Sequence, residues 1–384
     1  MSNLPPRPAP FSDTEMARRR SLLAEACAAR GVDRVVLYGA ERSGTAVPWL
    51  TRWPVTREAA VVFGADERDT MFVHFHNHIR LASEMARDAD VRWGNASTID
   101  EVIAELERRG GTGQTIGMVG TIPYQVRDAL AARFTGVVDL TPEYTAIRMI
   151  KSSEELEHLR YGAALSDAAL DALVDGIDIG RSDYELIDRI ERAYVPLGGS
   201  THIHYLSITP MAAPDRPVPA QQPVGAKVQR GSVLVTELSA AIRGYSGQVL
   251  RTIVVDEEPT LQYAELHDAA QRAFTAVTGA IRDGVHATEL HAAAALVTDA
   301  GFRLNDDLVH GFGGGYLPPV IGRLEDPIPD VTLRSGMTVV VQPNVMTMDG
   351  TAGVQTGELV LVTDEGFERL HIADLGLVRV TTRS

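Results

Sequence analysis

The segment Gly231–Thr252, GSVLVTELSAAIRGYSGQVLRT, constrains the fold more than any other part of this chain. Its apolar residues form two runs, separated by an Arg243-Gly244 pair that suits a tight turn, so we predict a β-hairpin. Such a hairpin places Glu237 and Gln248 roughly opposite each other on neighbouring strands. Polar side chains in apolar strands either find hydrogen-bond partners or line a cavity. The hairpin therefore predicts a buried polar network or a binding site.

The composition is that of a globular protein with ample core material. The 384 residues leave room for two ordinary domains or for one domain with a large appendage, and 45% of them are hydrophobic and 23% charged. A net charge of −15 argues against nucleic-acid partners and against anionic membranes. The single cysteine, Cys27, excludes an intramolecular disulfide and a cysteine-rich zinc site. The sequence has no long apolar run, and the polar start MSNLPPRPAPFSD does not resemble a signal peptide, so we expect a cytoplasmic protein.

The predicted elements divide the chain into an arm and two domains. Residues 1–13 are rich in proline and predict a flexible or extended arm. Residues 14–145 predict short strands alternating with helices, as in a small α/β unit. Residues 146–384 predict a long helix, a second helix, strands, a helix pair and further strands. This order indicates an α+β domain whose helices pack on one side of an antiparallel sheet.

Three histidines alternate in the sequence VHFHNH, at His74, His76 and His78. On a β-strand all three would face the same side. That pattern is similar to a row of metal ligands, because imidazole is a common ligand for zinc. The alternatives are an ordinary polar strand end and a subunit interface at which these residues reach toward a partner's site.

Five motifs occur in an order that resembles a known family. They are IKSSEELEHLR, GSVLVTELSAAIRGYSGQVLRT, HGFGGGY, VVVQPNV and GVQTGELVLVTDEG. This order resembles the pita-bread-fold family of creatinase, prolidase, Xaa-Pro aminopeptidase and methionine aminopeptidase. The resemblance implies a pita-bread domain over residues 146–384, preceded by a creatinase-like α/β domain over residues 14–145. It also implies a homodimer in which the N-terminal domain lies near the partner's site, where the three histidines would contribute.

The metal-dependent members of this family hold two divalent ions with two aspartates, one histidine and two glutamates. The matching positions here are Glu237, Gln248, His310, Gln342 and Gly357. Amides keep the shape and hydrogen-bonding capacity of carboxylates, but they lack the negative charge that two adjacent dications require. We therefore predict no dinuclear metal centre and no cofactor, and we retain a single weakly held ion as an alternative.

Creatinase is the family's metal-independent precedent, yet its catalytic residues are not matched either. Its catalytic histidine would fall in PVPAQQPVGAKVQRG, which contains no histidine. Leu250 and Gln342 stand at two of its glutamate positions, and Leu317 stands at the second family histidine. The resemblance therefore argues against ordinary creatine hydrolysis as well as against ordinary Xaa-Pro cleavage.

The polar residues that remain predict a site for a small polar molecule. We predict that His310 is a general acid or base and that Glu237 is its orienting or charge-balancing partner. Amide, imidazole and phenol groups suit the binding of a polar substrate. The predicted substrate-binding residues are Gln248, Gln342, Gln355, His202, His204, Tyr205 and Tyr316.

These residues predict a metal-independent enzyme acting on a C–N or related bond by hydrolysis, elimination or rearrangement. One alternative is a non-catalytic binding protein on a peptidase fold, in which the amides close a dead site. The other is a conventional metal-dependent Xaa-Pro aminopeptidase.

Overall fold

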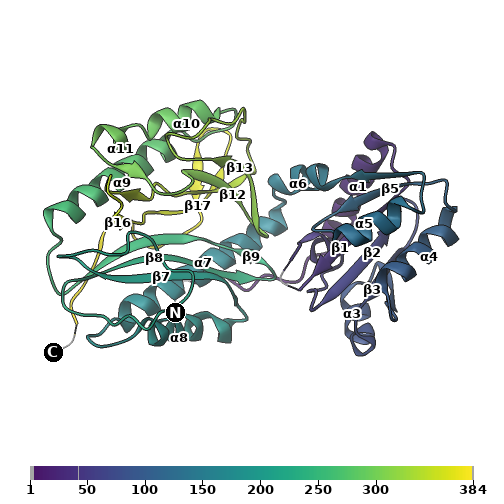
Figure 1. Cartoon of the computed structure of the whole chain (residues 1–384), viewed down its shortest axis with the longest axis horizontal. Helices are drawn as coiled ribbons and strands as arrows, with labels where there is room; N and C mark the ends of the chain where they lie inside the picture. Colours follow the sequence, from purple (N-terminus) through teal and green to yellow (C-terminus); the bar gives the residue numbers. More distant parts are fainter. Residues whose placement is uncertain (1–3, 42, 383–384) are drawn as a thin grey trace. The chain divides into compact units, whose positions relative to one another are not determined.

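A computed structural model, which describes residues 4–41 and 43–382, divides the chain into two units (Figure 1). One unit spans residues 9–148, and the other joins the residues up to Pro8 to Met149 and everything after it. Residues 4–12 carry no helix or strand, and Leu4 packs against the core of the second unit. The first three residues of the expected arm lie outside the described residues. No helix within 4–41 and 43–382 is long and apolar enough to cross a membrane.

The N-terminal unit is a six-stranded mixed sheet covered by helices on both faces. The strand order is β4 (Ala89–Trp93), β3 (Asp69–Val73), β2 (Glu58–Phe63), β1 (Arg34–Ala40), β5 (Thr115–Val119) and β6 (Gly136–Asp139). One core lies under α1 (Asp13–Arg30), α2 (Ala46–Thr51), α3 (Ile79–Met85) and α6 (Thr141–Met149), and the other lies under α4 (Thr98–Gly110) and α5 (Tyr124–Ala131). Cys27 is buried in the first core, where burial raises the pKa of its thiol to about 11.

The prediction that His74, His76 and His78 share one strand face is wrong. The strand β3 ends at Val73, where its pairing with the first residues of β2 runs out. The next residues turn into a short 3-10 helix, His76–His78, in which the His78 amide donates to the Phe75 carbonyl at 3.0 Å. His78 then lies beside Thr56, His76 packs on Trp93, and His74 lies beside Glu58, so the three rings do not form one row.

Helices α7 (Ser153–Gly176) and α8 (Asp183–Tyr194) open the C-terminal unit, and each starts with a capping box. The Ser152 hydroxyl accepts a hydrogen bond from the Glu155 amide, while the Glu155 carboxylate accepts one from the Ser152 amide. These reciprocal bonds satisfy backbone donors that the helix leaves unpaired. The sequence SSEE therefore fixes the start of α7, as predicted.

The C-terminal unit contains a ten-stranded sheet and a small three-stranded sheet. The main path of the large sheet is β13 (Tyr316–Ile321), β12 (Val309–Phe312), β14 (Thr338–Val341), β17 (Gly357–Val362), β10 (Val249–Val255), β8 (Ser232–Ile242) and β7 (Ser200–Pro210). The strands β9 (Tyr245–Ser246), β18 (Phe367–Arg369) and β19 (Val378–Val380) pair with β8, β17 and β10. The small sheet consists of β11 (Arg303–Leu304), β15 (Val345–Met346) and β16 (Gly353–Val354). The predicted hairpin is present, with positive φ angles at Arg243 and Gly244 in its turn.

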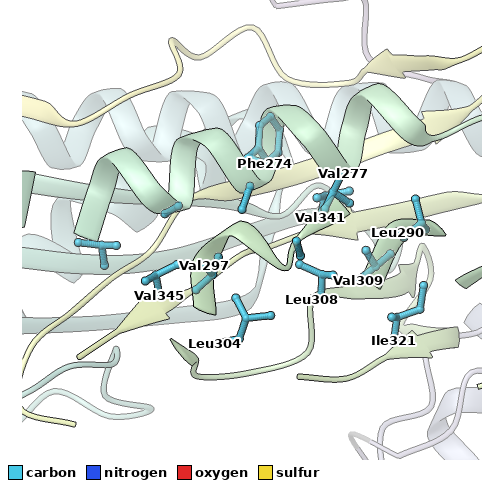
Figure 2. Packing of buried hydrophobic residues seen from close by; sticks show 14 of the residues in the cluster. Phe274, Val277, Leu290, Val297, Leu304, Leu308, Val309, Ile321, Val341 and Val345 are labelled. Atoms are coloured by element: carbon cyan, nitrogen blue, oxygen red, sulfur yellow. The ribbon is translucent and has the colours of Figure 1, made fainter. Parts of the chain in front are cut away.

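Helices cover both faces of this sheet, whereas the sequence predicted helices on one side only. In β8, Leu234 and Leu238 join the core beneath α7 and α8, while Val233 and Val235 join the core beneath α9 (Leu261–Ala280), α10 (Ala287–Ala293) and α11 (Leu296–Asp299). Side chains from α9 and from strands such as β12 and β14 fill this second core (Figure 2). A strand that is buried on both sides reads as a continuous apolar run. The run alone therefore did not distinguish one covered face from two.

Candidate functional site

Direct strand pairing aligns the first half of the site across four strands. Tyr205 on β7 pairs with Glu237 on β8, which pairs with Leu250 on β10. Leu250 in turn pairs with Gly357 on β17. Residues paired directly across antiparallel strands project to the same face of a sheet. Glu237 therefore shares one face with Gly357, which stands at the position that matches the last metal ligand of the family.

The same face continues to His310. Leu359 lies two residues after Gly357 on β17 and so projects to the same side. It pairs with Val340 on β14, which pairs with His310 on β12. The register thus brings Glu237 and His310 to a common face, in agreement with the prediction.

A chain of hydrogen bonds links the inherited ligand positions on this face. The buried Gln248 donates from Nε2 to Oε1 of Glu237 at 2.7 Å, and the same Nε2 lies 3.4 Å from Oε1 of Gln342. The Gln342 side chain also lies close enough to His310 to act on the pKa of its imidazole. The predicted proximity of Glu237 and Gln248 is confirmed, although the direct register partner of Glu237 is Leu250.

His310 is oriented by the backbone and not by Glu237. Its Nδ1 lies 3.2 Å from the carbonyl oxygen of Gly311. A carbonyl oxygen only accepts, so Nδ1 carries the proton of the neutral ring and Nε2 is left to accept one. Burial lowers the pKa of His310, which favours this neutral form near pH 7. Among the described residues His310 makes no direct hydrogen bond to Glu237, and the amides of Gln248 and Gln342 link Glu237 toward it.

Among the described residues, the carboxyl group of Glu237 has no cationic partner. Burial raises its pKa to about 7, and the negative charge of the exposed Asp306 adds to the shift. In the part of the chain that the structure describes, Gln248 is its hydrogen-bond partner, and no lysine or arginine forms an ion pair with it. Near neutral pH this group therefore exchanges readily between its acid and its base form.

Two aromatic rings, one exposed and one buried, pack against His310. Tyr316 stacks on the imidazole with ring centres 4.4 Å apart and an interplanar angle of 21°, and its hydroxyl donates to Asp307 at 2.6 Å. Phe312 lies edge-on to His310 at 5.7 Å and to His202 at 5.6 Å. The structure thus places His202 and Tyr316 near His310, as predicted.

His204 was predicted at the site but lies on the other face of β7. Its Nε2 is 2.8 Å from the hydroxyl of Tyr194 on α8. A bulge between Thr201 and Ile203 breaks the alternation that would have placed His202 and His204 together. Tyr205, the next residue, stands beside Glu237.

Gln355 is held by its backbone next to the same face. Its amide donates to the Thr252 hydroxyl at 2.8 Å, and that hydroxyl donates to the Gln355 carbonyl at 3.0 Å. Thr252 lies two residues along β10 from Leu250 and projects to the same side. The side-chain Oε1 of Gln355 is buried and has no hydrogen-bond partner in the part of the chain that the structure describes.

The residues present do not fit the two divalent ions that the metal-dependent members of the resembled family bind. At the last ligand position, a Cβ added to Gly357 would lie 2.4 Å from the Val341 carbonyl oxygen and 2.9 Å from the Gln342 Cα. The adjacent Glu358 is fully buried and bound to Arg251 at 2.8 Å and to Arg369. Within residues 4–41 and 43–382, no three histidine, cysteine or acidic side chains form a group that could hold a metal ion.

Sequence reasoning missed three residues that shape the site. Asp306 and Asp307 set the negative charge around Glu237 and His310, and Phe312 joins the two imidazoles of the site. All three lie within four residues of His310, so the sequence around the HGFGGGY motif contained them. Their roles depend on the turn before β12, which the glycine pattern does not specify.

Comparisons with known proteins agree with this fold. A profile described as metallopeptidase family M24 matches residues 157–364. The chain is similar to an Xaa-Pro dipeptidase of Pyrococcus furiosus, with 23% identity over 76% of this chain and 81% of that protein. It is also similar to the solved structures of an Xaa-Pro dipeptidase from Bacillus anthracis and an X-Pro aminopeptidase from Thermotoga maritima. The first has a TM-score of 0.79 at 21% identity and covers 95% of this chain and 100% of that one. The second has a TM-score of 0.82 at 18% identity and covers 94% and 99%.

Proposed function

The chain belongs to metallopeptidase family M24, and we propose that it is an enzyme of this fold that works without the family's metal ions. The proposed substrate is a small polar molecule, and the proposed reaction breaks or rearranges a C–N or related bond. The observation that carries the proposal is the donor set at the five inherited ligand positions. They hold one carboxyl group, one imidazole, two amides and a glycine that has no room for a side chain.

In the proposed reaction His310 and Glu237 do separate acid–base work. For hydrolysis, His310 Nε2 takes a proton from water as the water oxygen bonds to the reacting carbon. The C–N bond breaks, and the leaving nitrogen receives a proton from the imidazolium or from the Glu237 carboxyl group. Gln248 and Gln342 connect the two groups and position the substrate between them.

The test is turnover in the presence of a chelator. The purified protein, with its metal content measured, is assayed for release of a primary amine from a panel of small N-substituted amides, with and without EDTA. We expect release that EDTA does not reduce and that His310→Ala lowers by about 100-fold or more, as for loss of a general acid–base group. His286→Ala, at an exposed helix start in the same unit, is the matched control.

Two outcomes would contradict the proposal. Cleavage of an Xaa-Pro dipeptide that EDTA abolishes and manganese restores would identify a conventional metallopeptidase, which is the activity named for the similar proteins. Ligand binding without turnover, unchanged in His310→Ala, would identify a non-catalytic binding protein. The buried network of Gln248 and Gln342 is also compatible with that role.

We further propose a homodimer that works in the cytoplasm. Exposed aromatic rings at Phe75 and Trp93, beside His76, give the N-terminal unit a surface suited to a partner subunit. Light scattering gives the oligomeric state. If this surface completes the partner's site, mixing a His76→Ala variant with a His310→Ala variant restores activity, and no recovery would mean that each subunit has a complete site.

A further inference from the structure

Three acceptor groups on the site face have fewer hydrogen-bond partners among the described residues than folded proteins normally provide. Within residues 4–41 and 43–382, Oε1 of Gln248 and Oε1 of Gln355 have no hydrogen-bond partner, and the two residues are only 2% and 3% exposed. The Glu237 carboxylate adds an acceptor whose one hydrogen bond comes from Gln248, without a cation, in the part of the chain that the structure describes. Buried polar groups without partners are rare and costly, so each such group requires an explanation.

The two amide oxygens and the Glu237 carboxylate are all hydrogen-bond acceptors. The Gln248 amide is oriented by its Nε2, which donates to Glu237 at 2.7 Å, so its oxygen is the free atom. An anion or a carbonyl-rich ligand would add further acceptors and leave the three unsatisfied. A ligand that satisfies them must bring N–H or O–H donors to this face.

The charges around the site select a cation among such ligands. Asp306 is the charged group that acts most strongly on Glu237, and it has the same sign. Asp307 accepts a hydrogen bond from the hydroxyl of Tyr316, and the ring of Tyr316 stacks on His310. An exposed aromatic face next to carboxylates favours a positively charged group.

Building on the proposed function, we propose that the substrate carries a protonated amine, which binds against Glu237 where the metal-dependent relatives of this fold bind metal. The ammonium group donates to the Glu237 carboxylate and to Oε1 of Gln248. Gln355 lies beside the same face and supplies a further acceptor. The bond to be broken then extends from the amine toward His310.

The test compares isosteric probes by calorimetry on the full chain at about pH 8, where propylamine is protonated. We expect propylamine to bind about 10- to 100-fold more tightly than 1-propanol, as for hydrogen bonds to a charged group. Glu237→Gln should abolish that preference. Glu368→Gln, which removes an exposed carboxylate at the same cost in net charge, should leave it unchanged.

A second variant guards against a folding defect in the first. Gln248→Met keeps the length of the side chain without its oxygen, and it should weaken propylamine binding at least several-fold. Equal affinity for propylamine and 1-propanol would overturn the proposal, as would tighter binding of propylguanidine, which would assign the site to a planar cation. Propylamine binding without any turnover would support this inference while contradicting the proposed function. Turnover of an uncharged substrate without propylamine binding would do the reverse.

Discussion

Replacing Gly357 by alanine should destabilise the C-terminal unit, because this glycine marks where the site has closed over a former ligand position. The added Cβ would lie 2.4 Å from the Val341 carbonyl oxygen and 2.9 and 3.0 Å from Cα and Cβ of Gln342. Two of these three atoms are backbone, and none is the end of a flexible side chain. The clash therefore acts on the strand β14 itself.

The size of the effect follows from the movement that the clash demands. Bringing the Val341 oxygen out to an ordinary contact of 3.4 Å requires a shift of about 1 Å. Val341 pairs with Glu358 in the ladder between β14 and β17, so this shift strains the pairing directly beside it. Overpacking of this kind costs about 1–3 kcal/mol, and we expect the upper half of that range.

Urea unfolding followed by far-ultraviolet circular dichroism measures this loss. Tryptophan fluorescence is unsuitable, since Trp49, Trp53 and Trp93 are the three tryptophans of the chain and all lie in the N-terminal unit. The matched control is Gly279→Ala in the exposed part of α9, where an added Cβ meets nothing within 4 Å. Alanine there should stabilise by about 0.5–1 kcal/mol through helix propensity.

A Gly357→Ala variant within about 0.5 kcal/mol of the wild type would refute this reasoning. It would mean that β14 and β17 separate easily, and that a glutamate at this position has room. A combined Gln248→Asp, Gln342→Glu, Gly357→Glu variant that folds and binds manganese would refute it more strongly.

Three further predictions concern buried charges of the C-terminal unit. The pKa of Glu237 is raised from 4.5 to about 7, so this group contributes fully to stability below pH 4.5 and loses that contribution as the pH rises to 7. The urea midpoint of the wild type should therefore fall over this pH window, whereas that of Glu237→Gln should not. Asp167→Ala should cost about 3–5 kcal/mol in urea unfolding, because it leaves the buried His371 ring without the partner 2.7 Å from its Nδ1. Glu358→Gln should cost a similar amount, about 3–5 kcal/mol, because it leaves the Arg251 charge buried and unbalanced, and an unchanged midpoint would contradict that account.

Local signals in the sequence predicted the parts of the fold that depend on a few neighbouring residues. The SSEE sequence at Ser152 specifies a helix start, and the apolar runs around Arg243-Gly244 specify a hairpin. The predicted strand through His76 failed because the pairing of β3 with β2 ends at Val73, and the next residues form a 3-10 helix that the alternation of histidines does not reveal. The placement of His204 failed because a single bulge in β7 reverses the facing of every residue beyond it.

The site shows the same limit at a finer scale. The order of motifs predicted which residues would meet, and Glu237, Gln248 and Gln342 do lie in one hydrogen-bond chain, with His310 close to Gln342. The order could not show that His310 would be oriented by the Gly311 carbonyl instead of Glu237. That difference depends on the direction in which each side chain points, which the spacing of motifs in the sequence does not determine.

The two faces of the large sheet treat buried carboxylates in opposite ways. On the side of α7, Asp167 is paired with His371, and Glu358 is paired with Arg251 and Arg369. Each of these two carboxylates thus has a positively charged or imidazole partner. On the other face, Glu237 has no such partner in the part of the chain that the structure describes. Burial raises the pKa of this half-buried group to about 7, and a cation from outside would stabilise its ionised form. The contrast between the faces thus supports a cationic substrate independently of the family resemblance.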